Sequence, residues 1–351
     1  MEPVYRPGSR THSLHLCIGC TGLTRRHAHW DRVLGRDTMM EQVAAPRIGT
    51  ARATARIRHV PIETVVFSGL ALTTLAMLEF GLPMLSPTFQ VVLLGVLVAV
   101  LGLPHGALDP LIARRAGVWR TPLGFAAFNT VYLVIVVGVV LLWLVAPVLS
   151  LVAFLIVSAL HFGSDWNADR GLWLRFLAGF GLLSVPAFSH PDQVGAAYVV
   201  LAGADGAMVS DVQAGLAPLA LAGLLVAAVA AMRHRPHESV EIVLTSVLAL
   251  ACEPLVFFLV YFCALHSFRH LRAGFAEERG GGRLPPLIVV VYTVVPILAA
   301  GALLFVIGPS GDMPEQILQV LFIGLAGLTV PHMIVVTHEK RHQKKLMALP
   351  G

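Results

Sequence analysis

Long uncharged apolar runs are the feature that most limits how this chain can fold. Residues 122–145 read PLGFAAFNTVYLVIVVGVVLLWLV and residues 286–308 read PLIVVVYTVVPILAAGALLFVIG, and neither run contains a charged side chain. A helix needs about 20 such residues to cross the hydrocarbon layer of a bilayer. A membrane-spanning β-strand would instead alternate in polarity over about ten residues. The runs therefore predict transmembrane helices.

The composition agrees with an integral membrane protein. Of the 351 residues, 56% are apolar and only 13% are charged, and the mean hydropathy of +0.78 lies far outside the range of soluble domains. We predict an all-α, polytopic transmembrane helix bundle of about 8–10 spans within residues 61–340. With proline, glycine and charge as boundaries, the candidate segments are 62–82, 88–109, 122–145, 147–164, 172–188, 212–232, 239–252, 254–270, 286–308 and 315–338.

Segments 239–252 and 254–270 could be one helix broken at Glu253-Pro254 or two short helices. If they are two helices, the basic loops all lie on the cytoplasmic side of the membrane, as the positive-inside rule favours. Loop 189–211, which contains no Lys or Arg, then lies on the outer side. We therefore expect two helices, an even span count and both termini in the cytoplasm. The expected location is the plasma membrane, with residues 341–351 as a short cytoplasmic tail.

Residues 1–60 form a basic leader with ten Arg and four acidic residues. This charge suits a cytoplasmic segment attracted to anionic lipid, and we expect no nucleic-acid partner. The leader is expected to be disordered. A start further along the chain, at Met39 or Met40, stays open.

Cys17, Cys20, His27 and His29 resemble a zinc-binding set within this leader. The His-x-His spacing is unusual for a structural zinc finger, and the flanking sequence is rich in Arg, Gly and Thr. A disordered leader is therefore favoured over a zinc module.

Five histidines lie at or near the ends of predicted spans. On the expected topology these ends all face the cytoplasm, so the imidazoles share one depth. One such histidine alone is more often a water-bonded interfacial residue than a metal ligand. Several at one depth in a helix bundle predict a transition-metal site. They are His105 in GLPHGALDP, His161 in SALHFGSDW, His266 and His270 in ALHSFRH, and His332 in TVPHMIVVTHEK.

His266 and His270 are four positions apart, so on a helix they lie on one face, one turn apart. They would supply two ligands, completed by His105 and His161 from two other helices. An all-imidazole set suits Fe, Zn, Cu or Ni. The lack of a thiolate among these residues and of a His-Glu-x-x-His motif disfavours a haem-thiolate centre and a membrane zinc peptidase.

Asp109 follows His105 by four residues, and Asp165 follows His161 by four. Each carboxylate could accept the proton of the ring nitrogen that does not bind metal. The alternative, that both residues simply end helices near the interface, stays open.

The four histidine segments, in this order along nearly the whole chain after residue 60, resemble the Brp/Blh-type β-carotene 15,15′-dioxygenases of bacteria and archaea. The resemblance implies a helical membrane enzyme that binds Fe(2+) and uses O₂ to cut β-carotene at its central double bond, giving two all-trans-retinal. It implies His105, His161, His266 and His270 as the catalytic iron ligands, with His332 at a supporting position. A retinal-binding rhodopsin is a candidate acceptor of the product.

A substrate confined to the bilayer would need an apolar tunnel to set which bond meets the metal. Aromatic residues near the ligands are candidates for its walls: Phe162, Trp166, Phe258, Tyr261, Phe262 and Phe268.

Three alternatives remain from the residues alone. A lipid desaturase or hydroxylase with two irons would need roughly twice as many histidines in clusters, and this sequence has one HxxxH pair among its spans. A metal or proton transporter would spread its ligands over several depths. A structural membrane protein would bind no metal.

Overall fold

The fold is known from a computed structural model, which describes residues 60–83, 85–167, 171–278, 284–308 and 312–347. The leader expected at residues 1–60, with its cysteine and histidine set, lies outside the described residues except for Val60. The described residues all belong to one compact unit.

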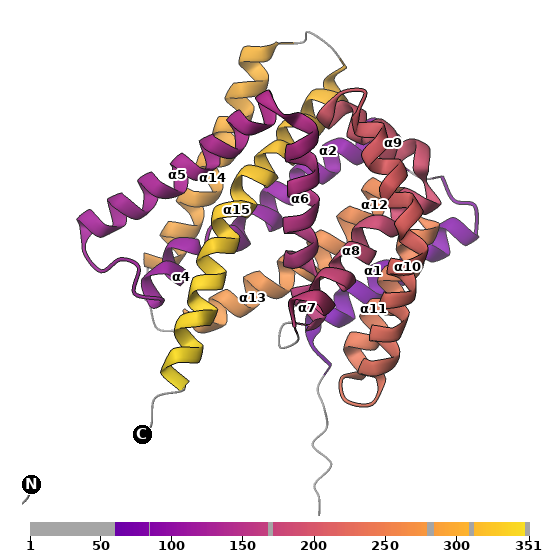
Figure 1. The fold of residues 1–351 in the computed structure, drawn as a ribbon, viewed down its shortest axis with the longest axis horizontal. Helices are drawn as coiled ribbons and strands as arrows, with labels where there is room; N and C mark the ends of the chain where they lie inside the picture. Colours follow the sequence, from indigo (N-terminus) through magenta and orange to yellow (C-terminus); the bar gives the residue numbers. More distant parts are fainter. Residues whose placement is uncertain (1–59, 84, 168–170, 279–283, 309–311, 348–351) are drawn as a thin grey trace, which may run out of the picture. The chain divides into compact units, whose positions relative to one another are not determined.

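All regular structure in the described residues is helical, which confirms the all-α prediction. Two of the elements are π-helices, named η1 and η2, and most of the α-helices are labelled in Figure 1. In chain order the elements are α1 (Ile62–Glu79), α2 (Pro87–Leu97), η1 (Val98–Gly102), α3 (Leu103–Gly106), α4 (Asp109–Arg115), α5 (Pro122–Val145), α6 (Pro147–Phe162), α7 (Ser164–Asn167), α8 (Leu172–Ser189), α9 (Pro191–Ala202), α10 (Gly206–Met232), α11 (Pro236–Ala251), α12 (Pro254–Leu259), η2 (Val260–Ser267), α13 (Phe268–Glu277), α14 (Leu284–Ile307) and α15 (Met313–Met347).

Nine helical stretches among the described residues are long and apolar enough to cross a membrane. This confirms the polytopic bundle. They are Ile62–Glu79, Pro87–Arg115, Pro122–Val145, Pro147–Trp166, Leu172–Ser189, Gly206–Met232, Pro254–Glu277, Pro285–Val306 and Met313–Met347.

Proline sets where several of these helices begin. α2, α5, α6, α9, α11 and α12 all have Pro in their first turn, where its missing N–H costs no helical hydrogen bond. Two of these starts also carry a side-chain cap: Ser86 accepts from the Phe89 N–H, and Thr121 accepts from the Gly124 N–H.

The segment from 239 to 270 is divided as expected, because α11 ends at Ala251 and α12 begins at Pro254. The tenth predicted span is not among the nine. α11 has 16 residues, a length of about 24 Å against the roughly 30 Å hydrocarbon layer.

Two boundaries differ from the sequence prediction. The expected loop 189–211 contains α9, which starts at Pro191 and ends at Ala202, followed by Gly203 with a φ of 77°. The expected tail 341–351 is helical as far as Met347, and Lys344 and Lys345 in the last turn suit the negative end of the α15 dipole.

α6 and α8 pack with their backbones in direct contact because two glycines lie between them. A Cβ added at Gly163 would lie 1.7 Å from the Arg175 carbonyl oxygen, and one at Gly179 would lie 1.8 Å from the Ala159 oxygen. Any other residue would therefore force the helices apart. This contact lies at the end of α6 that leads into α7 (Figure 1).

The two π-helices pack against each other. A Cβ at Gly102 in η1 would lie 2.8 Å from a ring carbon of Phe262 in η2. π-helical turns are rare and occur frequently at functional sites, where they change the direction of the side chains that follow. η1 ends three residues before His105, and η2 contains His266.

A candidate metal centre

Five imidazoles from four different helical stretches form one cluster. Neighbouring ring centroids lie 4.6 Å apart for His161 and His266, 5.4 Å for His105 and His266, and 4.6 Å for His266 and His270. His332, from α15, has its centroid 5.2 Å from that of His161. The structure thus brings together all five of the histidines singled out in the sequence.

Donor atoms in this cluster are close enough to share an ion. One nitrogen each from His105, His161 and His266 lie within 4.8 Å of one another. In a second set, a carboxylate oxygen of Asp165 and one nitrogen each from His266 and His270 also lie within 4.8 Å of one another. His266 belongs to both sets and therefore stands at the middle of the cluster.

Asp165 is the carboxylate that contacts the pair on η2 and α13. Its side chain is fully buried, with Oδ2 3.0 Å from His266 Nδ1 and Oδ1 3.1 Å from His270 Nε2. Tyr261 donates its hydroxyl to Asp165 Oδ2 at 2.7 Å. Since Asp165 holds Nδ1 of His266, the Nε2 of this ring is the nitrogen left for a metal.

Asp109 makes the equivalent contact on the other side of the cluster. Its Oδ1 lies 2.7 Å from His332 Nδ1, and its Oδ2 accepts the Tyr132 hydroxyl at 2.9 Å. Asp109 is 1% exposed, so its charge is satisfied within the protein.

The carboxylates therefore serve different histidines from those expected from spacing. Asp109 was expected to pair with His105, and Asp165 with His161. The expectation is wrong because a helix end separates each pair: α3 ends at Gly106 before α4 begins, and α6 ends at Phe162 before α7 begins. Residues four apart lie on one helical face only while the helix continues.

Two ring nitrogens in the cluster are buried without a hydrogen-bond partner among the described residues. They are Nδ1 of His105 and Nε2 of His266. Buried polar atoms are nearly always satisfied, so an exception points to a missing ligand. The donor set, imidazole with nearby carboxylate, fits iron, zinc, copper or nickel, and Cys263 belongs to neither set of donors.

Aromatic rings cover part of the cluster. Phe162, Phe262 and Tyr261 have centroids 4.9, 5.6 and 6.3 Å from that of His266. Phe258 forms a second layer, stacked on Phe262 at 5.0 Å. These four of the six proposed wall residues lie at or next to the imidazoles.

The other two aromatic residues have different surroundings. Trp166 donates its Nε1–H to Glu241 Oε2 at 2.9 Å. Phe268 lines a surface cavity with Leu271 and Phe275, on another part of α13.

Sequence reasoning missed Tyr132, Glu241 and Arg269 next to the cluster, and it named Tyr261 only as a candidate wall residue. Tyr132 and Tyr261 bind its carboxylates, and Glu241 and Arg269 lie behind Asp165. The available signal was charge: Glu241 is surrounded by apolar residues in SVEIVLTSV, and Arg269 stands between the two histidines of ALHSFRH.

Fold and cluster together define a polytopic helical membrane protein with a buried centre of imidazoles and carboxylates. A family model described as beta-carotene 15,15′-dioxygenase matches residues 96–338, a range that includes all five clustered histidines. The chain belongs to the β-carotene 15,15′-dioxygenase family, and it is an enzyme of the carotenoid-cleaving dioxygenase class.

Two curated relatives agree. The beta-carotene 15,15′-dioxygenase of uncultured marine bacterium 66A03 is 28% identical over 249 residues, which cover 68% of this chain and 90% of the relative. The probable beta-carotene 15,15′-dioxygenase Blh of Halobacterium salinarum is 28% identical over 348 residues, which cover 86% of this chain and 99% of the relative. No solved structure matches the chain significantly.

Proposed function

We propose that this protein is an iron-dependent dioxygenase that cleaves β-carotene at its central double bond with O₂ and releases two all-trans-retinal. The activity for which both relatives are named supports the substrate and the bond. The observation that carries the proposal on this chain is the buried imidazole cluster with its unpartnered nitrogens.

His105, His161, His266 and His270 would hold Fe(2+). Neutral imidazoles suit this ion, and the burial of His161 and His266 keeps water away from it. Ferrous iron at such a site supplies a binding position for O₂ and the electrons that activate it. His332 is left beside the ligand set, because neither set of converging donors includes it.

The carboxylates would fix the orientation of the imidazole rings and the nitrogen that carries the proton. Asp165 accepts from Nδ1 of His266, which leaves Nε2 of that ring as a lone-pair donor. Asp109 does the same for His332 through Nδ1. A carboxylate next to the imidazoles also offsets the charge of a divalent ion.

β-Carotene offers no polar group for recognition, so shape and apolar contact must position it. The substrate is dissolved in the bilayer, and an enzyme built from membrane helices can admit it from the side. Phe162, Phe258 and Phe262 present apolar surface next to His266. They would hold the polyene beside the iron and exclude water.

Location and partners follow as further parts of the proposal. The nine apolar helices support residence in a bilayer. We place the protein in the plasma membrane with both termini in the cytoplasm, from the distribution of Lys and Arg in its loops. This topology needs an even number of crossings, so the 16-residue α11 would have to cross the bilayer together with the nine longer helices. Retinal released into the same bilayer could pass to a retinal-binding rhodopsin.

The test is expression of the full chain in cells that make β-carotene. We expect loss of carotenoid colour, accumulation of retinal, and one ¹⁸O atom in each retinal when the cells are supplied with ¹⁸O₂. His105→Ala and His266→Ala should abolish both product and bound iron while the protein still inserts. His190→Ala is the matched control, because His190 contacts Ser189 at the end of α8, outside the cluster.

Undiminished retinal from His266→Ala would contradict the ligand assignment. Absence of retinal and of bound iron in the unmodified protein would contradict the proposed function itself.

A further inference from the structure

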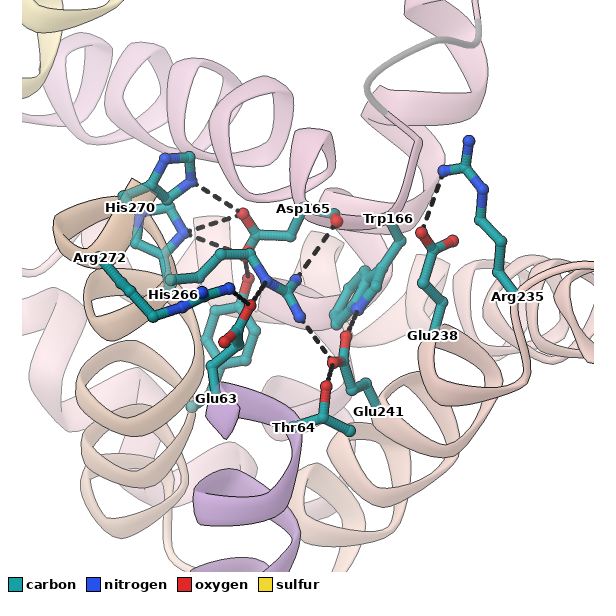
Figure 2. A network of polar contacts seen from close by, with 12 residues as sticks. Glu63, Thr64, Asp165, Trp166, Arg235, Glu238, Glu241, His266, His270 and Arg272 are labelled. Carbon is teal, nitrogen blue, oxygen red and sulfur yellow. Dashed lines mark hydrogen bonds and ion pairs between the residues drawn. The ribbon is translucent and has the colours of Figure 1, made fainter. Parts of the chain in front are cut away.

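A polar network lies behind the imidazole cluster and joins α1, α7, α11 and α13 (Figure 2). Its centre is Glu241 of α11, whose side chain is fully buried. Glu241 Oε2 accepts from Trp166 Nε1 at 2.9 Å, and Oε1 accepts from Arg269 Nη2 at 2.6 Å and from the Thr64 hydroxyl. Both carboxylate oxygens are thus used as acceptors.

The partners of Glu241 are the chain neighbours of cluster residues. Trp166 directly follows Asp165, and Arg269 directly precedes His270. Arg269 also donates Nη1 to the main-chain oxygen of Asp165 at 3.3 Å. Glu241 therefore holds both sides of the Asp165–His270 contact through bonds to the adjacent residues.

Asp165 needs such support because its own helix is short. α7 spans Ser164–Asn167, and a helix of one turn has no stability of its own. Within the described residues, the Ser164 hydroxyl donates to the His161 oxygen at 2.6 Å, and Tyr261 holds the Asp165 carboxylate itself. The Trp166 and Arg269 bonds tie this turn to α11 and α13.

We propose that Glu241 is a positioning residue for the metal centre. It places Asp165 so that this carboxylate holds His266 and His270 in the orientation that binds metal. The inference rests on the proposed function, in which these imidazoles hold iron. No imidazole of the cluster contacts Glu241 directly, so its effect reaches the metal through Trp166, Arg269 and Asp165.

The chemistry of the network predicts which variants fail. In Glu241→Gln the side-chain NH₂ would face either the Trp166 N–H or the Arg269 guanidinium, and both of these are donors. Arg269 would also lose its nearer carboxylate partner and keep Glu63, whose Oε1 lies 3.8 Å from its Nε. Glu241→Asp keeps both acceptor oxygens and the charge at a shorter reach, so it should restore part of the function. Trp166→Phe removes one hydrogen bond and keeps the aromatic packing.

The experiment uses the purified full chain in detergent, titrated with Co²⁺, whose visible absorption reports the number and arrangement of its ligands. We expect Glu241→Gln to weaken Co²⁺ affinity by about tenfold or more and to change the absorption spectrum. Glu241→Asp and Trp166→Phe should show smaller losses in the same direction. A thermal unfolding curve of the metal-free protein separates misfolding from a displaced ligand set.

The control is Glu339→Gln, which removes one carboxylate from the ion-pair network of Arg115 at 3.2 Å and touches no residue of the centre. It should leave the cobalt spectrum unchanged. A wild-type spectrum and affinity in Glu241→Gln would overturn the inference, and so would wild-type values in Trp166→Phe if the Gln variant does not fold. Failure of the unmodified protein to bind Co²⁺ or Fe²⁺ would instead overturn the proposed metal centre, and this inference with it.

Discussion

His332 Nδ1 lies 2.7 Å from Asp109 Oδ1, although the two residues are 223 positions apart in the chain. The second oxygen of Asp109 accepts the Tyr132 hydroxyl at 2.9 Å. This contact joins α15 to α4 and α5 beside the imidazole cluster. A carboxylate next to Nδ1 favours a proton on that nitrogen.

Asp109→Asn should lower Fe²⁺ affinity by less than the roughly 10- to 100-fold typical of a carboxylate that orients a metal ligand, because its partner His332 lies beside the proposed ligands and is not one of them. The amide cannot accept from both His332 and Tyr132 as the carboxylate does. Competition with a chromophoric chelator measures the affinity. Asp192→Asn is the control, because Asp192 is exposed in the first turn of α9. Equal affinities in the two variants would show that Asp109 does not support the centre.

Tyr132→Phe should lower the free energy of unfolding by about 1 kcal/mol, because one hydrogen bond to a buried carboxylate is lost. It should also weaken iron binding, though less than Asp109→Asn, since the contact with His332 remains. Tyr198→Phe is a matched control: it removes a 2.7 Å bond to Gln213 away from the cluster. Thermal unfolding should respond similarly in both variants, while iron affinity should change in Tyr132→Phe alone.

Gly163→Ala should destabilise the protein by about 3 kcal/mol or more, since an added methyl group would overlap backbone that cannot move independently. The Cβ would lie 1.7 Å from the Arg175 oxygen. The change should also reduce bound iron, because His161 and Asp165 both lie two residues from Gly163. The unfolding midpoint and the iron content of purified protein measure the two effects.

Gly138→Ala provides the comparison for this variant. Gly138 lies within α5 with no atom within 4 Å of an added Cβ, so stability should stay the same or rise by less than about 1 kcal/mol. Similar losses in the two alanine variants would show that the α6–α8 contact is not specially tight.

Iron should stabilise the folded protein against heat. A ligand that binds only the native state at 100 times its dissociation constant adds about 2.7 kcal/mol. Adding Fe²⁺ under anaerobic conditions should therefore raise the unfolding midpoint, and a chelator should reverse the rise. His266→Ala should show no response to either treatment. A rise of the same size in that variant would place the iron elsewhere.

Much of this fold could be predicted from the sequence, because hydrophobic length alone identifies membrane helices. The five histidines were found because imidazoles are costly in apolar helices, and few occur there without a role. The partners of Asp109 and Asp165 could not be found in this way. Local spacing describes contacts within one helix, whereas Asp109 meets His332 through tertiary packing.

The role of α11 also could not be predicted from the sequence. Its mix of Glu238, Glu241 and apolar residues resembles a short span, and only the structure shows that Glu241 is paired with Arg269 and Trp166. The short helix α9 was not predicted, because a segment of 12 residues that contains Asp192 and has glycines within and after it has the composition of a loop.

The cluster draws its side chains from positions 105 to 332, which means that no early portion of the chain carries a complete set. During synthesis the first two imidazoles enter the membrane long before η2, α13 and α15 have left the ribosome. With the proposed ligand set, iron could bind only after η2 and α13 have been inserted, and a nascent chain that stalls before that point would be inactive as well as incomplete.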